Sequence, residues 1–229
     1  MIIDVITPAL NEEQAIASVI KDVPSNLVRY FIVCDNGSKD RTVEIARSLG
    51  AVVVSEPERG YGAACLKGIE FLNNLPLEEQ PDIVVFIDAD YSDYPEEIPE
   101  LIRPILENKA DLVIGSRVLG NAERGSLNFV QRFGNALATL LIRCIYGYQF
   151  TDLGPFRAIK FKTLQELGMK DRNYGWTVEM QIRVAKLKIR ATEVPVNYKN
   201  RIGKSKVSGT VKGSILAGYK IIYTIFKLL

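Results

Sequence analysis

The chain has 229 residues, of which 47% are hydrophobic and 24% are charged, and its formal net charge is +2. This is the composition of an ordinary globular protein, and the length allows one domain with a sizeable core plus an appendage. The sequence has no histidine, which excludes histidine-based acid–base catalysis, Ser-His-Asp triads and histidine-ligated zinc.

The first half of the chain predicts strands that alternate with helices. Strands are expected at residues 2–7, 28–34, 51–55 and 83–87, and helices at residues 11–23, 40–49 and from residue 63 to about residue 72. This alternation is typical of an α/β fold with a mostly parallel sheet and helices on both faces. Because the first residues lead directly into strand-like sequence, we expect no signal peptide.

The second half of the chain has a different pattern. It predicts a strand at residues 111–115, a helix at residues 127–146, and two segments that could supply antiparallel strands, residues 151–160 and 190–196. We expect one domain over residues 1–207 and a C-terminal amphipathic helix over residues 208–229.

The C-terminal segment, residues 213–229, is almost entirely apolar apart from Lys220 and Lys227, and Lys212 precedes it. At helical spacing these lysines fall roughly on one stripe, which favours a helix that lies in a membrane interface over one that spans the bilayer. A helix packed on its own domain or on a partner subunit is the alternative.

Positive charge is concentrated at the same end of the chain. Residues 183–229 contain 11 Lys and Arg and a single acid, Glu193. Such a tail could bind nucleic acid, anionic lipid or a phosphorylated substrate, or it could be a solvated face. Charge alone does not decide between these alternatives.

The three cysteines are Cys34, Cys65 and Cys144. They are odd in number, widely spaced and set in apolar surroundings, which argues against a framework of disulfides. We expect all three to be reduced residues of the core in a cytosolic protein.

The most informative pattern is the apolar run at residues 83–87 followed by Asp88-Ala89-Asp90. The run predicts a strand buried on both faces, so the acids emerge at the carboxyl end of a strand, where open α/β sheets bind ligands. A local turn would let both carboxylates reach one Mg²⁺ or Mn²⁺, ions that suit a diphosphate. Alternatively, the two acids simply begin a loop. Residues 8–12, 35–38 and 59–62 also follow predicted strands, so we expect one site at this edge of the sheet.

Several motifs follow one another in a specific order. They lie at residues 8–13, 34–40, 60–62, 88–90 and 115–117. Together they resemble the motifs of the inverting family 2 glycosyltransferases, which have the Rossmann-like GT-A fold. Residues 152–157 and 203–206 resemble the dolichyl- and polyprenyl-phosphate sugar transferases within that family.

The resemblance implies a nucleotide-sugar donor and a metal ion, Mg²⁺ or Mn²⁺. The residues that it implies for the donor are Pro8, Leu10, Glu12, Asp35, Ala89, Arg157, Lys204 and Lys206. It implies that Asp88 and Asp90 hold the metal and that they act in catalysis together with Arg117 and Arg132, whose planar guanidinium groups suit phosphate.

Local structure offers a simpler interpretation of some of these residues. Glu12 could be an acid at a helix N-terminus, and Asp35 could form a turn. Lys204 and Lys206 could belong to a solvated basic loop.

The sequence also departs from the family pattern at several positions. Leu10 stands where an aromatic residue is common, Asn36 where a second Asp is common, and Ser92 where some relatives have Gln near the metal. Residues 153–155 differ as well, since relatives commonly have Thr-Ser-Gly there. The donor therefore stays open between GDP-mannose, UDP-glucose and another sugar nucleotide, and the metal between Mg²⁺ and Mn²⁺.

The lack of histidine favours one class of acceptor. A phosphate monoester is already an anion at neutral pH, so it can attack the anomeric carbon without a base. We therefore expect transfer to a polyprenyl or dolichyl phosphate with inversion, by a protein peripheral on the cytoplasmic face of a membrane. Several relatives carry transmembrane helices after this domain, so a membrane-protein partner or a homo-oligomer is also considered, and no nucleic acid is expected.

Two other functions stay open at this point. A transferase of the same fold could act on a soluble hydroxyl acceptor, in which case Asp93 or Asp152 would serve as the base. A non-catalytic protein that binds nucleotide sugars or membrane surfaces could also be built on this fold.

Overall fold

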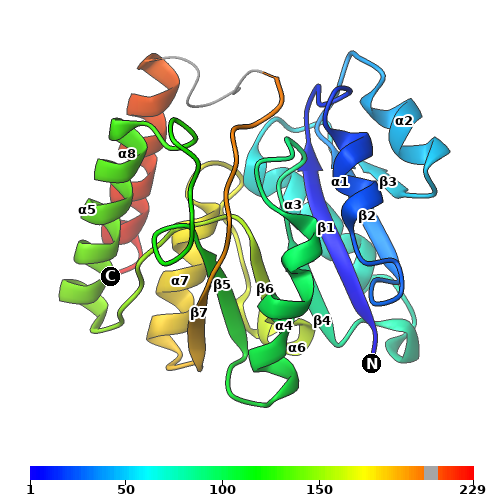
Figure 1. The fold of residues 1–229 in the computed structure, drawn as a ribbon. Coiled ribbons are helices and arrows are strands. Elements are labelled where there is room, and N and C mark those ends of the chain that lie inside the picture. Colours follow the sequence, from blue (N-terminus) through cyan, green and yellow to red (C-terminus); the bar gives the residue numbers. More distant parts are fainter. Residues whose placement is uncertain (204–210) are drawn as a thin grey trace.

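The structure is a computed structural model that describes residues 1–203 and 211–229, with the backbone alone for residues 211–215. Within these residues, seven strands form one sheet in the order β3-β2-β1-β4-β6-β5-β7 (Figure 1). The strands are β1 (Ile3–Ala9), β2 (Tyr30–Asp35), β3 (Val52–Ser55), β4 (Ile83–Phe86), β5 (Leu112–Ser116), β6 (Arg157–Lys160) and β7 (Ala191–Pro195). The predicted α/β fold with a mostly parallel sheet is therefore confirmed.

The helices occupy the connections between the strands and follow the last strand. They are α1 (Ile16–Asp22), α2 (Thr42–Ser48), α3 (Tyr61–Asn73), α4 (Ile98–Leu106), α5 (Phe129–Tyr146), α6 (Phe161–Leu167), α7 (Trp176–Lys186) and α8 (Val211–Lys227), with short 3₁₀ turns η1 (Leu77–Glu79) and η2 (Pro95–Glu97). Asn11 adopts a φ of 53° and a turn follows it, so α1 begins several residues after the predicted start. Helix α4 was not predicted, and Pro104 lies inside it.

Strand direction changes in the second half of the sheet. As expected, β6 runs antiparallel, to both β4 and β5. The expectation that residues 190–196 form an antiparallel strand is wrong, because β7 pairs with β5 in parallel, with Ala191 opposite Leu112. Helices α6 and α7 carry the chain from β6 back to the start of β5, where the amide of Leu112 donates to the carbonyl of Arg190 at 3.2 Å.

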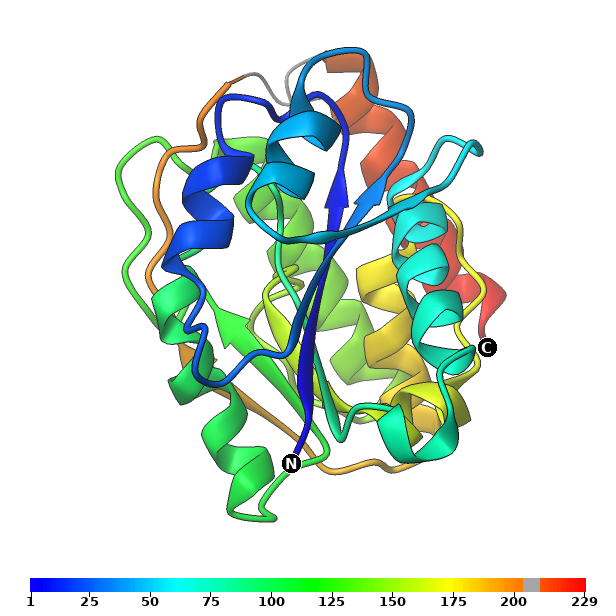
Figure 2. The same ribbon diagram turned by 90° about the vertical axis from the view of Figure 1, so that its right-hand side faces the viewer.

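Helices cover both faces of the sheet, and each face has its own apolar core. One core holds Ile16 of α1 and Leu101 of α4, and the other holds Leu72 of α3 and Trp176 of α7. Figure 2 shows α1 in blue and α3 in cyan-green on opposite sides of the central strands. Because both faces are covered, ligands can reach the sheet only at the ends of its strands.

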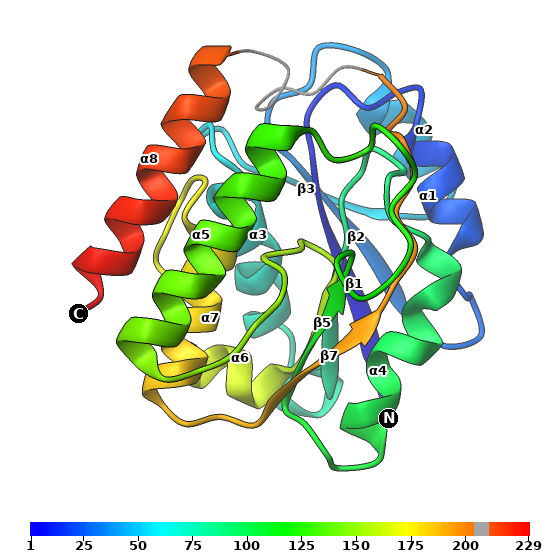
Figure 3. The ribbon, with the colours of Figure 1, turned by 60° about the vertical axis from the view of Figure 1, so that its left-hand side comes forward.

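The C-terminal helix α8 lies beside α5 and α7, as Figures 1 and 3 show. Its Thr224 and Ile225 are buried, and the hydroxyl of Tyr146 donates to the carbonyl of Ile225 at 2.6 Å. Lys220, expected on an exposed stripe, forms an ion pair of 2.9 Å with Asp171. The alternative in which this helix packs on its own domain therefore describes it better, and the predicted domain boundary at residues 207 and 208 lies outside the described residues.

None of the helices within residues 1–203 and 211–229 combines the length and the hydropathy that a bilayer span requires. The cysteines differ from one another in their surroundings. Cys34 and Cys65 are buried and free, as expected, whereas Cys144 is free and exposed on α5. The prediction of a core position is therefore wrong for Cys144.

Two glycines of the 60–62 motif allow α3 to begin in close contact with the loop before α7. A Cβ atom on Gly60 would lie 2.0 Å from the carbonyl oxygen of Arg172, and one on Gly62 would lie 2.0 Å from that of Asp171. No real Cβ contact is so short, so only glycine fits at either position. This close approach fixes the place of Tyr61 between the two glycines.

We expect Gly62→Ala to lower the free energy of unfolding by about 3 kcal/mol or more, because the new methyl group meets backbone rather than a flexible side chain. Gly134→Ala in α5 is the matched control, since nothing lies within 4 Å of its ideal Cβ. There, alanine should be neutral or slightly stabilising. Chemical denaturation monitored by circular dichroism measures both changes, and equal stability of the two variants would contradict the packing argument.

Candidate functional site

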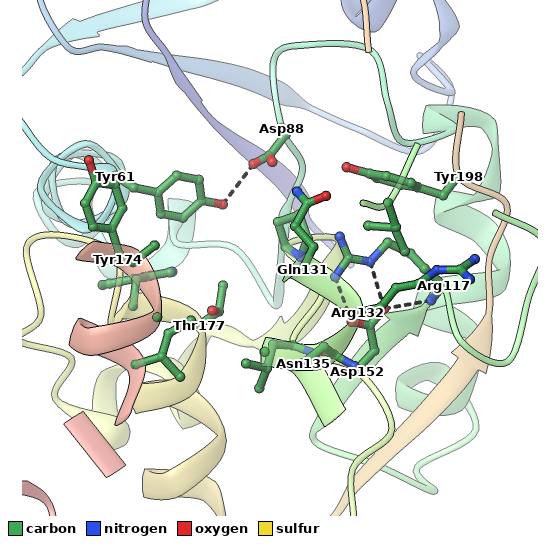
Figure 4. A pocket seen from close by; sticks show the side chains of 18 of the residues that line it. Tyr61, Asp88, Arg117, Gln131, Arg132, Asn135, Asp152, Tyr174, Thr177 and Tyr198 are labelled. Carbon is green, nitrogen blue, oxygen red and sulfur yellow. Dashed lines mark hydrogen bonds and ion pairs between the residues drawn. The ribbon is translucent and has the colours of Figure 1, made fainter. Parts of the chain in front are cut away.

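A cavity of about 1480 Å³ opens at the carboxyl ends of β1 and β4. Its walls come from the loops after β1, β4, β5 and β7, from the start of α3, and from α5 and α8. Figure 4 shows Asp88 and Tyr61 across from Arg117 and Asp152, and it also labels Gln131, Arg132 and Asn135, which belong to α5. Loops that lie far apart in the sequence therefore form one site, as the strand order requires.

Asp88 and Asp90 stand at the turn that follows β4. The hydroxyl of Tyr61 donates to Oδ1 of Asp88 at 3.0 Å. Oδ1 of Asp90 accepts the amide and the hydroxyl of Ser92, at 2.9 and 2.5 Å. Tyr91, which lies between Asp90 and Ser92, adopts a φ of 62°, a conformation that bulky residues rarely adopt. The backbone is thus held in a tight turn that keeps the two acids together.

Negative charge is in excess around this turn. Burial and the neighbouring charge of Asp90 raise the pKa of Asp88 to about 7. Asp93 is 1% exposed, and neither of its carboxylate oxygens has a hydrogen-bond partner within the described residues. Carboxylates whose negative charge is compensated only in part fit a divalent cation of the Mg²⁺ or Mn²⁺ type.

The part of the chain that the structure describes supplies few ligands for such an ion. Among the described residues there is no cluster of three or more acids, cysteines or histidines able to hold a metal. A cation at Asp88 and Asp90 would therefore complete its coordination with water and with oxygens of a bound diphosphate.

Arg117 is the main cation on the opposite side. Its Nε and one terminal nitrogen donate to the two oxygens of Asp152 at 2.8 and 2.7 Å, and its backbone amide donates at 2.8 Å. The guanidinium carbon lies 5.0 Å from the ring centre of Tyr198. This bidentate pair is largely buried, with side-chain exposures of 14% for Arg117 and 1% for Asp152. Arg117 is thereby fixed in orientation before any ligand binds.

Helix α5 brings Arg132 to the mouth of the cavity, where its side chain is exposed. The helix begins with a capping box between Asn128 and Gln131. One turn later, the side-chain Nδ2 of Asn135 donates to the carbonyl of Thr151 at 2.8 Å, and its Oδ1 accepts the backbone amide of Leu153 at 2.8 Å. These bonds hold the 151–153 loop, which carries Asp152, against α5.

The residues predicted for the donor separate into three groups. Pro8, Leu10, Glu12 and Ala89 line the cavity. Asp35 and Arg157 do not belong to its lining, and Lys204 and Lys206 lie outside the described residues.

Both residues that do not line the cavity are engaged with nearby backbone. The carboxylate of Asp35 accepts the amides of Gly37 and Ser38 at 3.2 and 3.0 Å, as a turn former does. Arg157 is completely buried, and its guanidinium donates to the carbonyls of Leu153, Gly154 and Thr177. In this structure Arg157 supports the floor of the site rather than its surface.

Tyr61, Tyr198 and Arg201 also line the cavity, although no role was predicted for them. The place of Tyr61 in the 60–62 motif is the one signal in the sequence that points to it. Asn36, named only as a departure from the family pattern, has a structural role: its amide donates to the carbonyls of Glu56 and Glu58 at 2.9 and 2.7 Å. It thus ties the loop after β3 to the end of β2.

Comparison with known proteins gives consistent results. The family model described as "Glycosyl transferase family 2" matches residues 4–168. An uncharacterized glycosyltransferase from Mycobacterium bovis is 35% identical over 218 residues, which cover 94% of each chain. A dolichyl-phosphate hexose transferase from Haloferax volcanii is 31% identical over 93% of this chain and 89% of the relative.

The fold is similar to that of glucosyl-3-phosphoglycerate synthase from Mycobacterium tuberculosis. Its crystal structure in complex with Mn²⁺, UDP-glucose and phosphoglyceric acid superimposes with a TM-score of 0.74 and 25% identity, and the match covers 99% of this chain and 79% of that chain. The neighbour thus binds a metal, a nucleotide sugar and a phosphorylated acid in one complex.

We expect Tyr61→Phe to weaken Mn²⁺ binding at pH 7 by several-fold, because Asp88 loses a donor that favours its ionised form. The pKa of Asp88 should then rise further, so more of this carboxyl is protonated at pH 7. At pH 9, where Asp88 is ionised in both proteins, the difference should vanish.

Titration of Mn²⁺ in the presence of UDP or GDP, followed by electron paramagnetic resonance, measures this effect. Protonation of the nucleotide affects the variant and the wild type equally when both are measured at the same pH. Tyr30→Phe, at the start of β2, is the matched control and should behave as the wild type. A difference that is the same at pH 7 and pH 9 would rule out the protonation argument.

Proposed function

Because the chain belongs to glycosyl transferase family 2 and has the GT-A fold, we propose that it transfers a hexose from a nucleotide-sugar donor to a polyprenyl or dolichyl phosphate, with inversion. One observation carries this proposal: a single cavity joins Asp88 and Arg117 to an apolar wall of α5 and α8. The apolar wall consists of Leu137, Leu140, Ile221 and Ile222. Such a cavity suits a phosphate with an apolar tail.

The donor would bind at the carboxyl ends of β1 and β4. Pro8, Leu10, Glu12 and Ala89 line this part of the cavity and would surround the nucleotide. The related synthase from Mycobacterium tuberculosis binds UDP-glucose. Donors of the UDP-glucose and GDP-mannose classes are the candidates to be tested first.

Asp88 and Asp90 would hold the metal ion, either Mg²⁺ or Mn²⁺. When bound, the ion supplies positive charge to the diphosphate that leaves the sugar. Support comes from the excess negative charge at this turn and from the Mn²⁺ complexes of the structural neighbour.

The acceptor phosphate would be oriented by Arg117 and Arg132. Arg117 is fixed by Asp152, so it can hold a phosphate oxygen without first losing conformational freedom. An oxygen of the phosphate then forms a bond with the anomeric carbon of the sugar while the bond from that carbon to the nucleoside diphosphate breaks. No proton has to be removed, which agrees with a sequence that lacks histidine.

A small phosphorylated metabolite is a second candidate acceptor. The structural neighbour binds phosphoglyceric acid, and the arginines that suit a lipid phosphate would also suit a soluble one. Attack by a hydroxyl group would require a base, however. Asp152 is engaged by Arg117, and Asp93 is buried and does not line the cavity. The sequence-based choice of these two acids as the base therefore has little support.

A lipid acceptor implies that the protein binds to a membrane surface. The neighbouring helices α5 and α8 expose large apolar side chains, among them Phe129 (81%), Phe133 (60%), Tyr219 (68%) and Phe226 (51%). Two of these rings, Phe129 and Phe133, stack at 6.4 Å beside Arg132. Aromatic and basic side chains of this kind suit the interface of an anionic bilayer. We place the protein on the cytoplasmic face of a membrane as a peripheral enzyme.

A transfer assay tests the proposed reaction. Radiolabelled UDP-glucose, UDP-N-acetylglucosamine and GDP-mannose are each incubated with Mn²⁺ or Mg²⁺ and a polyprenyl phosphate in detergent micelles. We expect label from one donor to enter the organic phase. Label that remains in the aqueous phase on added phosphoglyceric acid would instead support the soluble acceptor.

Asp90→Ala should lower the rate of this transfer by at least about a thousandfold, because one of the two carboxylates for the metal is lost. Glu166→Ala, an exposed acid on α6, is the matched control and should retain full activity. Full activity of Asp90→Ala in the same assay would contradict the proposed role of this carboxylate.

Membrane binding is tested separately by co-sedimentation with vesicles that contain anionic lipid. Replacing both Phe129 and Phe133 with Glu should reduce the bound fraction at least about tenfold, because two rings that would insert into the membrane are lost and two charges of the same sign as the lipid are added. Leu77→Glu is the control, since Leu77 is 85% exposed on η1, away from α5 and α8. Equal binding of both variants would argue against α5 as the membrane-facing element.

A further inference from the structure

Arg201 lies in the segment that follows β7 and lines the acidic end of the cavity. One of its terminal nitrogens forms an ion pair with Oδ2 of Asp90 and lies 3.8 Å from Oε1 of Glu12. Both carboxyl groups are buried, since Asp90 is 4% and Glu12 is 8% exposed. Arg201 thus already supplies positive charge to one of the two acids that would hold the metal.

The backbone brings Arg201 to this position. The amide of Ile202 donates to the carbonyl of Asp90 at 3.0 Å, and that of Lys199 donates to the carbonyl of Ser92 at 2.9 Å. These hydrogen bonds hold the residues on both sides of Arg201 against the turn after β4. The guanidinium is therefore held at Asp90 by the path of the chain and not by its side chain alone.

The hydrogen-bonding capacity of Arg201 is only partly used in this arrangement. Its Nε is buried and has no hydrogen-bond partner within the described residues. A guanidinium group has five N–H donors in a planar fork, and buried donors are normally paired. An anion with several oxygens at this end of the cavity would satisfy donors that Asp90 leaves unpaired.

A metal ion and Arg201 compete for the same oxygen of Asp90. Oδ1 already accepts two hydrogen bonds from Ser92, so a cation would approach Asp90 through Oδ2, the oxygen that Arg201 contacts. Two positive charges this close repel each other strongly in a partly buried site. Arg201 must therefore leave Asp90 when the cation arrives.

We propose that Arg201 competes with the divalent cation for Asp90, so that the cation binds tightly only together with a nucleoside diphosphate, which offers the displaced guanidinium a new anionic partner. This inference rests on the proposed function, because it takes Asp88 and Asp90 as the metal ligands. It assigns Arg201 the role of coupling metal binding to donor binding. The planar fork of Arg201 suits two oxygens of a diphosphate.

The experiment measures Mn²⁺ binding rather than sugar transfer. Free Mn²⁺ is quantified by electron paramagnetic resonance at pH 8, first without nucleotide and then with UDP or GDP. Arg201→Met retains an unbranched side chain similar to the aliphatic stem of arginine and removes the charge. We expect it to bind Mn²⁺ alone at least about tenfold more tightly than the wild type, because the competing cation is gone. Added nucleotide should increase its Mn²⁺ affinity less than it does for the wild type.

Lys199→Met is the matched control. It removes a positive charge from the same segment, but the ammonium of Lys199 lies over the rings of Tyr91 and Tyr94, at 3.2 and 4.2 Å from their centres, and not on a carboxylate. Its Mn²⁺ affinity should stay close to that of the wild type. Arg201→Lys retains the charge and should retain the preference for Mn²⁺ with nucleotide, and Arg201→Gln gives a second neutral variant.

The outcomes separate this inference from the proposed function. Equal affinity of wild type, Arg201→Met and Arg201→Gln for Mn²⁺ alone would overturn the competition, while Mn²⁺ binding with nucleotide would leave the proposed metal site intact. If neither the wild type nor any variant bound Mn²⁺ with UDP or GDP, both proposals would be wrong. Thermal unfolding checks that each variant is folded before binding is compared.

Discussion

The site depends on keeping two carboxylates together at the end of β4 in partly buried surroundings. Burial disfavours ionised acids, and the raised pKa of Asp88 shows that the nearby donors compensate only in part. Each of these donors depends on a different part of the fold. Tyr61 is placed by the close approach of α3 to the loop before α7, and Arg201 by the segment after β7. The remaining negative charge is what makes this edge of the sheet suitable for a cation and a diphosphate.

A second group of charges faces the first across the cavity. Asp152 holds Arg117, and the backbone amide of Asp152 in turn donates to Glu193 of β7 at 3.1 Å. Arg157 lies beneath this pair, with its donors directed to backbone carbonyls. Arg117 is thus fixed before a ligand arrives, whereas on the acidic side Asp90 is paired with Arg201 and Asp88 accepts the hydroxyl of Tyr61, which compensates the negative charge only in part. Preorganised cations of this kind contribute to rate because no reorganisation is needed during the reaction.

Much of the fold could be predicted because buried strands leave continuous apolar runs, as at β1 and β4. The direction of β7 could not, because it depends on which neighbour the strand joins and not on its own residues. The prolines of α4 concealed a helix whose apolar face nevertheless packs on β5. In the site, Asp88 and Asp90 were found because they end a buried strand. Arg201 follows no strand-end motif and reaches Asp90 only through the folded chain, so its pairing leaves no signal in the sequence.

The three cysteines differ in reactivity for a physical reason. Cys34 and Cys65 are buried, and burial raises the pKa of both thiols, so neither is available as a thiolate. Cys144 is exposed on α5, the helix that also carries Arg132 and the exposed Phe133. A fluorophore or spin label that reacts with thiols would therefore attach at one native position. The unmodified chain thus contains its own attachment point for a spectroscopic probe, on a helix that borders the cavity.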